Sequence, residues 1–367
     1  MNDRERNLLA CAGIAGIFLA IQLGALALVE PFQEEGHQVV EDTSDPTISF
    51  LYLGAILVVT ALMLGLIKYG GDSALRLVII FASAYISLFV LRIVVPDVLS
   101  VSVAGSEIDV LAWAGALGVG LALYLYPEWY VIDAAGTVMG IGGAGLFGIN
   151  FGILPALVLL VVLAVYDAIS VYGTEHMLTL ASGVMEMRVP VVLVIPTTLS
   201  YSFLDADDPT ADEETEVDPP GVAELTELGP DGVSTLPEER LVAIDEETLD
   251  GIDEETADAI REALPGRDAL YIGLGDAVIP TVLVASAAFF IESGPTLTVL
   301  GVSANLPAAG AIGGTLLGLG VLLWLVVKGR AHAGLPLLNG GAITGYLLGA
   351  LLSGLTLAEA LGVTGLF

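Results

Sequence analysis

Charged residues make up only 15% of the 367-residue chain, and 11 basic residues stand against 43 acidic ones. The resulting net charge of -32 would repel a phosphate backbone, which argues against nucleic-acid binding. The single cysteine, Cys11, excludes an intrachain disulfide and any C-x-x-C site. The three histidines, His37, His176 and His332, are far apart and form no His-Glu-x-x-His pair, so we expect neither a metal nor another cofactor.

Apolar residues are abundant by contrast. Hydrophobic residues make up 55% of the sequence beside 44 glycines, and the mean hydropathy is +0.85. A helix needs about 20 apolar residues to span the hydrocarbon of a lipid bilayer. Runs of about this length lie at 8–29, 48–68, 75–95, 110–126, 131–149, 152–172, 270–291, 304–327 and 335–357. We therefore expect an all-α polytopic protein with nine transmembrane helices, embedded as a multi-pass protein in the cell membrane.

Acidic residues concentrate in one segment of the chain. From Asp205 to Asp268 there are 23 acidic and 3 basic residues. This segment separates two groups of apolar runs, so we predict six helices in residues 1–172, an acidic and partly disordered loop in residues 173–269, and three helices in residues 270–367. Such acidity is also typical of proteins from extreme halophiles, whose hydrated carboxylates keep them soluble at high salt.

The loop itself has two kinds of sequence. Residues 205–221 contain almost nothing apolar to bury, which predicts disorder. Residues 249–261 instead carry apolar side chains at helical spacing, and they predict a short helical hairpin within residues 237–264. The hairpin resembles a helix-hairpin-helix element, but the surrounding acid argues against DNA binding.

Basic residues indicate the orientation, because Lys and Arg in short loops stay on the cytoplasmic side. With the N-terminus inside, the basic residues that fall inside are Arg4, Arg6, Lys68, Arg76, Arg188, Arg240, Arg261, Arg267, Lys328 and Arg330. Of all the basic residues, Arg92 alone falls outside. We therefore expect the N-terminus and the acidic loop in the cytoplasm, and the C-terminus outside.

Three aspartates lie within the predicted spans, where a charge is costly and usually functional. Asp133 follows Trp129 close to an interface, and we interpret it as a cap at the start of a helix. Asp167 lies roughly 8–9 Å from the cytoplasmic end of the sixth span, at the helical rise per residue. Asp276 lies roughly 9 Å from the same face if the seventh span begins near Leu270. Two antiparallel neighbours would thus hold carboxylates at matching depth.

A pair of carboxylates in such a place suits acid–base chemistry. Two carboxylates a few ångströms apart in a low dielectric share one proton and titrate as a pair. The ionised member can take a proton from water that attacks a peptide carbonyl, while the protonated member donates to the carbonyl oxygen. Serine or cysteine catalysis lacks support, because the sequence has no Gly-x-Ser-x-Gly elbow and Cys11 has no evident partner.

The residues around the two aspartates resemble a known family. Tyr166-Asp167 in the sixth run, Gly273-Leu274-Gly275-Asp276 in the seventh, nine runs and a long loop between six and seven are similar to the presenilin and signal peptide peptidase superfamily of intramembrane aspartyl proteases. The Pro-Ala-Leu motif of that family is degraded here. The matching segment reads Ala333-Gly334-Leu335-Pro336, which keeps the Leu and the following Pro.

The resemblance implies roles for individual residues. Asp167 and Asp276 would be the catalytic pair. Substrate-positioning residues would be Tyr166, Gly273, Leu274, Gly275, Gly334, Leu335 and Pro336. The predicted orientation is that of presenilins, whereas signal peptide peptidases are inverted. The resemblance therefore implies a presenilin-like homologue that cleaves single-span membrane proteins and needs no cofactor. The acidity of the chain adds the expectation of a halophilic, archaeal source.

Two other functions stay open on the sequence. Prepilin and preflagellin peptidases are also membrane aspartyl proteases with a Gly-x-Gly-Asp motif, but they are shorter and lack the Tyr-Asp arrangement. An ion-coupled transporter could use paired acids near broken helices to bind H⁺ or Na⁺. Such a transporter would be expected to show inverted repeats, and none is evident between the six-span and three-span parts.

Two further patterns concern packing. Glycines recur every four residues in the last two runs, at Gly310, Gly314 and Gly318 and at Gly341, Gly345 and Gly349. Such spacing lines one face of a helix and predicts close helix packing. The apolar segment 189–196 is too short to cross the bilayer and is rich in β-branched residues. It is either a strand that could offer an edge to an unwound substrate or a linker at the membrane surface.

Overall fold

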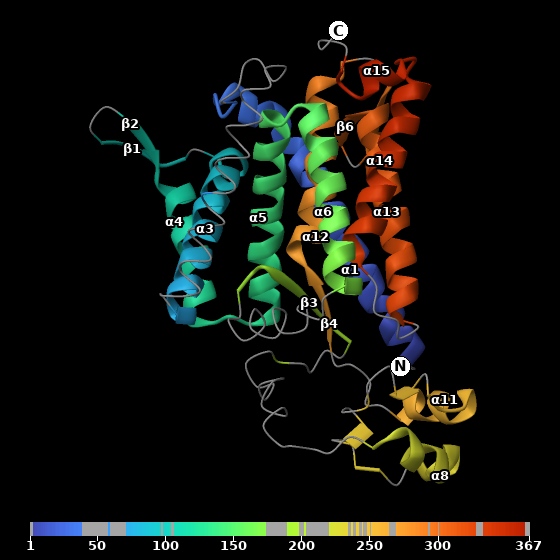
Figure 1. Cartoon of the computed structure of the whole chain (residues 1–367). Coiled ribbons are helices and arrows are strands. Elements are labelled where there is room, and N and C mark those ends of the chain that lie inside the picture. The colour runs from blue at the N-terminus through green and yellow to red at the C-terminus, as the bar shows by residue number, and fades with distance from the viewer. Residues whose placement is uncertain are drawn as a thin grey trace. The chain divides into compact units, whose positions relative to one another are not determined.

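The computed structural model describes most of the chain and defines its elements (Figure 1). The described residues are 3–38, 58, 71–96, 98–103, 106–173, 189–197, 202, 220–233, 236–237, 240–241, 244, 248–249, 251–263, 269–292, 294–299, 301–327 and 333–363. By contacts they divide into two units, residues 1–6 with 196–270 and residues 7–195 with 271–367. Each unit is described by itself.

The larger unit consists mainly of apolar helices. They are α1 (Asp3–Glu34), α3 (Gly71–Val94), α4 (Val110–Leu125), α5 (Trp129–Asn150), α6 (Ile153–Gly173), α12 (Leu274–Phe290), α13 (Leu306–Val327) and α14 (Gly334–Leu352). Among the described residues, six of these are long and apolar enough to cross a membrane, and α4 and α12 are shorter apolar helices. The helices coincide with eight of the predicted runs. The remaining run, 48–68, lies outside the described residues apart from Val58.

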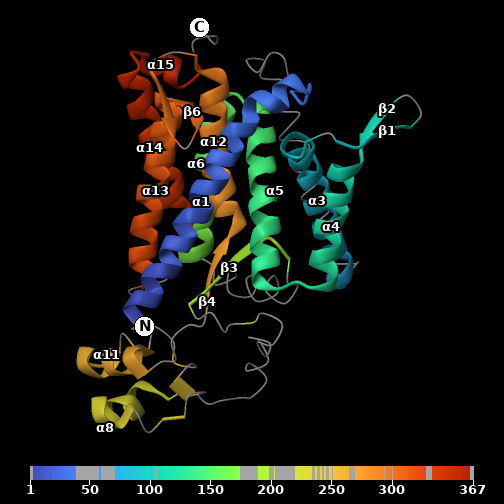
Figure 2. The same cartoon turned by 180° about the vertical axis from the view of Figure 1, so that it is seen from behind.

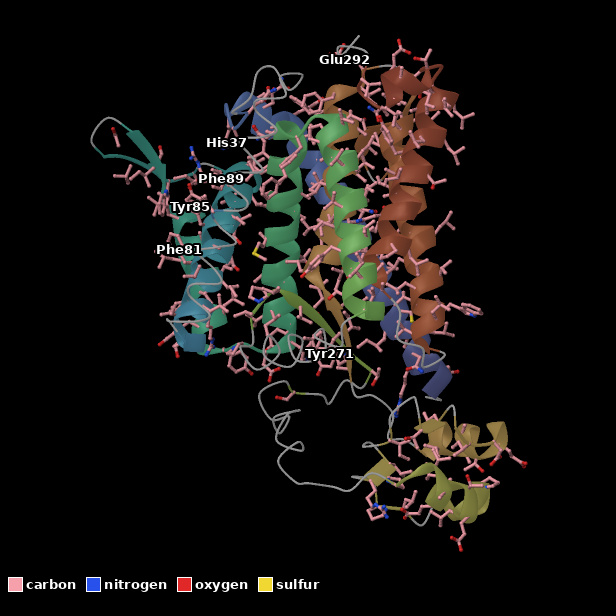
Figure 3. The ribbon with its side chains drawn as sticks, in the orientation of Figure 1. His37, Phe81, Tyr85, Phe89, Tyr271 and Glu292 are labelled. Carbon is pink, nitrogen blue, oxygen red and sulfur yellow. The ribbon has the colours of Figure 1, made fainter. Side chains whose placement is uncertain are left out.

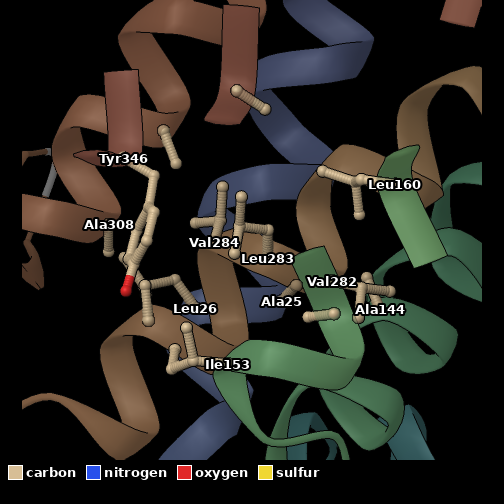
Figure 4. Packing of buried hydrophobic residues seen from close by; sticks show 14 of the residues in the cluster. Ala25, Leu26, Ala144, Ile153, Leu160, Val282, Leu283, Val284, Ala308 and Tyr346 are labelled. Atoms are coloured by element: carbon tan, nitrogen blue, oxygen red, sulfur yellow. The ribbon is translucent and has the colours of Figure 1, made fainter. Parts of the chain in front are cut away.

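Helix α12 occupies the middle of the larger unit. Figure 1 shows α6 in front of it, and Figure 2, seen from behind, shows α1 crossing it on the other side. Its residues from Pro280 to Ala287 are all buried. Val282, Leu283 and Val284 form a core with residues of α1, α6, α13 and α14, part of which is drawn in Figure 4. A helix that is apolar on all sides in this way belongs in the interior of a bundle.

Short strands connect some of the larger helices, and one short helix follows the last of them. Strands β1 (Ser100–Val103) and β2 (Ser106–Asp109) pair antiparallel, with Ser100 opposite Asp109. Strands β5 (Thr296–Val299) and β6 (Val302–Asn305) do the same, with Thr296 opposite Asn305. After β6, the Asn305 side chain accepts the backbone N–H of Ala308 and so caps the start of α13. Helix α15 (Leu357–Ala360) follows α14.

A third pair of strands corrects one expectation and decides between two others. Strand β3 (Val192–Pro196) pairs with β4 (Ala269–Gly273), so segment 189–196 contains a strand, one of the two structures that the sequence left open. The seventh span does not begin as a helix near Leu270, because β4 precedes it and α12 starts only at Leu274. The sequence Ala-Leu-Tyr-Ile-Gly suits a strand, and Gly273 ends it as the N-cap of α12. The estimate of depth from helical rise therefore does not apply to Asp276.

The ends of α1, α3 and α5 meet around His37 (Figure 3). Its ring makes edge contacts with Phe32 and Phe89, at centroid distances of 5.8 and 5.0 Å. Tyr85 makes a further edge contact with Phe89 at 5.0 Å. The Asn150 side chain, at the end of α5, donates to the His37 carbonyl at 3.1 Å. These contacts fix one end of the bundle.

The predicted glycine faces pack α13 directly on α14. A side chain at Gly310 would overlap the carbonyl oxygen of Gly345, and one at Gly314 would overlap that of Gly341. A side chain at Gly318 would meet the carbonyl of Leu337 in the same way. Because only glycine leaves room for this approach, the packing role inferred from the spacing is confirmed.

The smaller unit contains the described part of the acidic loop. Helices α8 (Val222–Gly232) and α11 (Glu254–Ala263) pack around buried apolar side chains, which include Leu225, Val233, Leu241 and Ile260. Helix α11 overlaps residues 249–261, where helical spacing was predicted. The helix that packs against it is α8, which precedes the hairpin predicted within residues 237–264. Hydrogen bonds from Thr256 cap α11 and hold the pKa of Asp253 below its usual value. Disorder was predicted for residues 205–221, of which residues 205–219 lie outside the described residues.

Candidate active site

Asp167 lies on α6 and is hydrogen-bonded to the start of α14. Its side chain is only 7% exposed. Its Oδ2 atom accepts a hydrogen bond from the backbone N–H of Leu335, at 3.0 Å. Leu335 is the second residue of α14, where backbone N–H groups have no partner within the helix. The open end of α14 therefore supplies a donor to a carboxylate on another helix.

Asp276 lies in the first turn of α12 and is half-buried. It interacts electrostatically with Asp167. A Cβ atom built on Gly334 would lie 3.3 Å from Oδ2 of Asp276, and one built on Gly273 would lie 3.6 Å from the same atom. The start of α14 thus lies beside both carboxyl groups: Leu335 donates a hydrogen bond to Asp167, and a side chain at Gly334 would meet Asp276. Three helices, α6, α12 and α14, meet at this point.

A second hydrogen bond holds α14 against α6. The Asn339 side chain is fully buried and donates through Nδ2 to the carbonyl of Leu160, at 2.9 Å. Asn339 lies one turn after Leu335, and Leu160 lies two turns before Asp167. Sequence reasoning missed Asn339, although a polar side chain one turn after the family motif in an apolar run was a usable signal.

The surroundings of the two carboxyls favour one shared negative charge. The N-terminus of a helix carries partial positive charge and free N–H donors, which stabilise an anion. Asp167 faces this end of α14 through Leu335. Two nearby carboxylates screened from water do not both ionise comfortably. The arrangement can therefore present one carboxylate and one carboxylic acid to a bound group.

Asp133 has a different place from the one that the sequence suggested. Helix α5 begins at Trp129, and its N-cap is Glu128, whose side chain accepts the backbone N–H of Trp129 at 3.2 Å. Asp133 is the fifth residue of the helix, so the interpretation of Asp133 as the cap was wrong. It is 7% exposed, and its Oδ1 accepts the backbone N–H of Val194 in β3, at 2.8 Å.

The remaining predicted site residues differ in how far they are buried and in their positions on the helices. Tyr166 is 67% exposed, so its side chain is not part of the buried pair. Leu274 is buried, with Cδ1 3.4 Å from the position of a Cβ atom on Gly140 of α5. Gly275 is exposed in the first turn of α12, and Pro336 is the third residue of α14.

Metal ligands do not gather in the part of the chain that the structure describes. No group of three or more His, Cys, Asp or Glu side chains there could hold a metal ion. His176 and His332 lie outside the described residues.

Comparisons with known proteins show the family of the chain. The family described as signal-peptide peptidase, presenilin aspartyl protease matches residues 15–355. The chain belongs to this family. Two solved structures, each of a presenilin family intramembrane aspartate protease, in the C222 and P2 space groups, are 29% and 30% identical to it, each with a TM-score of 0.53. Each match covers 93% of this chain, and 99% and 97% of the respective solved chains. No curated protein matches the sequence.

Membership of the presenilin and signal peptide peptidase family decides the class of activity. The protein is an intramembrane aspartyl protease and a multi-pass membrane protein. The two aspartates that the structure brings together lie on α6 and α12 inside the matched region. Because the family is one of aspartyl proteases, the match favours proteolysis over the ion-coupled transport that the sequence left open.

Proposed function

We propose that the protein hydrolyses peptide bonds of single-span membrane proteins, with Asp167 and Asp276 as its catalytic pair. The observation that supports this proposal is the start of α14, where Leu335 donates to Asp167 and Gly334 leaves space beside Asp276. We also propose nine transmembrane helices in the cell membrane with a cytoplasmic N-terminus, as the basic residues indicate. The same topology divides the chain into six helices in residues 1–172, a cytoplasmic loop in residues 173–269 and three helices in residues 270–367.

In this proposal the two aspartates have different roles. Asp167 is the ionised member, because the Leu335 N–H and the positive end of α14 stabilise its charge. It takes a proton from the attacking water. Asp276 is the protonated member, since the charge of Asp167 opposes a second charge beside it. It donates its proton to the carbonyl oxygen as the tetrahedral intermediate forms.

The degraded motif at the start of α14 is compatible with this mechanism. The group that reaches Asp167 is a backbone N–H, which any residue except proline provides. Gly334 leaves a Cβ position 3.3 Å from Asp276, so a small residue is required there. The changes of the first Pro to Ala333 and of Ala to Gly334 therefore leave the donor and the space in place.

Substrate would reach the pair as an extended chain. A peptide bond inside a helix is covered by its own hydrogen bonds, so the helix must unwind before water can attack. Strand β4 leads directly into α12 and pairs with β3, and their sheet offers an edge to which an extended segment could add. Gly273 and Gly275 leave the backbone beside Asp276 open for this approach.

The test is cleavage of a purified single-span substrate by the full-length protein in detergent. Wild-type protein should release two fragments, and the cut should map by mass spectrometry to the membrane-spanning segment. Asp167→Asn and Asp276→Asn should release none. Cleavage by either variant at the wild-type rate would overturn the assignment of the pair.

A further inference from the structure

Asp133 is a buried acid that the proposed chemistry does not use. It lies in a membrane-spanning helix with 7% of its surface exposed, where an ionisable side chain is costly and usually has a function. Glu128 already caps α5, so capping does not explain Asp133. The partner that the structure gives Asp133 is the backbone N–H of Val194, 2.8 Å from its Oδ1 atom.

Val194 connects Asp133 to the candidate active site through the β3–β4 sheet. Val194 is the middle residue of β3, which pairs with β4. Beyond the strands, the Leu274 N–H donates to the Val191 carbonyl at 2.7 Å. Strand β4 ends at Gly273, and Asp276 follows three residues later. The position of β3 therefore determines where α12 begins.

The same face of α5 supports both ends of this connection. A Cβ atom on Gly136 would lie 3.3 Å from Cδ2 of Leu193 and 3.5 Å from the carbonyl oxygen of Pro190. One turn later, a Cβ atom on Gly140 would lie 3.3 Å from Cγ2 of Val278 and 3.4 Å from Cδ1 of Leu274. Small residues thus bring β3 and the first turns of α12 against α5, and Asp133 adds a directional hydrogen bond to this contact.

We propose that Asp133 is a positioning residue of the protease, which fixes β3 on α5 and thereby sets the β4–α12 junction that carries Asp276. The inference rests on the proposed catalytic role of Asp276. Asp133 acts as a hydrogen-bond acceptor, so its charge is not required. An amide oxygen at the same position serves equally, whereas an aliphatic side chain leaves the Val194 N–H buried and unpaired.

The test compares three variants of the full-length protein in the cleavage assay. Asp133→Asn keeps an acceptor oxygen and should retain kcat/KM within about threefold. Asp133→Leu keeps the size but has no acceptor, and should lower kcat/KM by about tenfold to a hundredfold, the effect of a displacement of about 1 Å at a catalytic group. Val194→Pro removes the donor from the other side and should have the same effect as Asp133→Leu.

The double variant separates positioning from general loss of stability. The Val194 N–H donates to Asp133, and proline at this position removes that donor. If the two substitutions break one interaction, Asp133→Leu with Val194→Pro should be no worse than either alone. Ile149→Ala, in the buried core at the other end of α5, is the matched control. It should lower the melting temperature but leave kcat/KM of the folded protein unchanged.

Three results would overturn the inference. Inactivity of Asp133→Asn equal to that of Asp167→Asn would give Asp133 a part in proton transfer. Wild-type kcat/KM in Asp133→Leu would show that the bond to Val194 positions nothing. Additive losses in the double variant would show two separate effects. Failure of the catalytic proposal is distinguishable, because it would appear as cleavage by Asp167→Asn or Asp276→Asn, whatever Asp133 does.

Discussion

Leu335 donates its backbone N–H to Oδ2 of Asp167 at 3.0 Å, although 168 positions separate the two residues in the sequence. The bond joins the first turn of α14 to the middle of the candidate site. Because the donor belongs to the backbone, it is independent of the side chains that the family motif specifies. The motif has diverged in this chain, and the structure nonetheless contains this hydrogen bond.

Asp167→Asn and Asp276→Asn should each lower cleavage by at least about a hundredfold, the usual contribution of a general acid or base. Asparagine is nearly isosteric with aspartate but cannot exchange the proton, so both variants should remain in the membrane at the wild-type level. Quantitative blotting of membranes beside the cleavage assay would check both points. The wild-type pH profile should be bell-shaped, with limbs that belong to the pair. Activity in either variant comparable with the wild type would contradict this prediction.

Leu335→Pro should lower kcat by about tenfold to a hundredfold, because a hydrogen bond to a charged group contributes about 1.5–3 kcal/mol. Proline is tolerated in the first turn of a helix, so α14 should still form. Leu335→Ala is the control, since it shortens the side chain but keeps the N–H. Equal activity of the two variants would show that the backbone donor has no catalytic effect.

Gly341→Ala should destabilise the protein by about 1–3 kcal/mol, the usual cost of overpacking. The added methyl group would overlap the carbonyl oxygen of Gly314 on α13. Gly340→Ala is the matched control, because a Cβ atom there meets nothing within 4 Å. Thermal unfolding in detergent should place Gly341→Ala below the wild type and Gly340→Ala at or above it. Equal melting temperatures would argue against the glycine contact.

Cysteines introduced near Glu34 and near Ser234, in a Cys11→Ala background, should react with an impermeant reagent from outside and from inside, respectively. This follows from the basic residues that the topology places in the cytoplasm. Labelling of intact cells and of inverted vesicles would measure it. The reverse pattern would favour the orientation of signal peptide peptidases.

Deletion of residues 206–219 should leave cleavage largely unchanged, since these residues offer almost nothing apolar to bury. Composition alone would extend the tolerated deletion to residue 236. The structure contradicts this extension, because α8 places Leu225 and Val233 in a buried cluster with Ile260. Deletion of 222–236 should therefore expose this cluster, and limited proteolysis should cut α11 faster than in the shorter deletion. Equal protection of α11 from proteolysis in both deletions would contradict the proposed packing of α8 on α11.

The sequence predicted the features that depend on local pattern. Long apolar runs predicted eight helices that the structure describes, and glycines four residues apart predicted the contact of α13 with α14. Acids within apolar runs singled out Asp167 and Asp276, because a charge in that setting is rare. The sequence thus led to the pair without any knowledge of its geometry.

What the sequence did not predict depends on contacts between distant segments. The start of α12 was placed too early, because the short apolar segment 269–273 adjoins a long apolar run and is separated from the helix only by its pairing with β3. Asp133 was interpreted as a cap, since its partner Val194 is 61 positions away. The position of Gly334 beside Asp276 likewise follows from the packing of α14 on α12.

The backbone contact between α13 and α14 also limits how the protease can open. Carbonyl groups and glycines of the two helices interlock at three successive levels, so neither helix can rotate or slide without the other. The donor at Leu335 is attached to this pair. A substrate that displaced α14 would therefore displace α13 with it, and the Leu335 N–H would leave Asp167 until both helices returned. The return of the two helices and the stabilisation of the Asp167 carboxylate by Leu335 would then be a single movement.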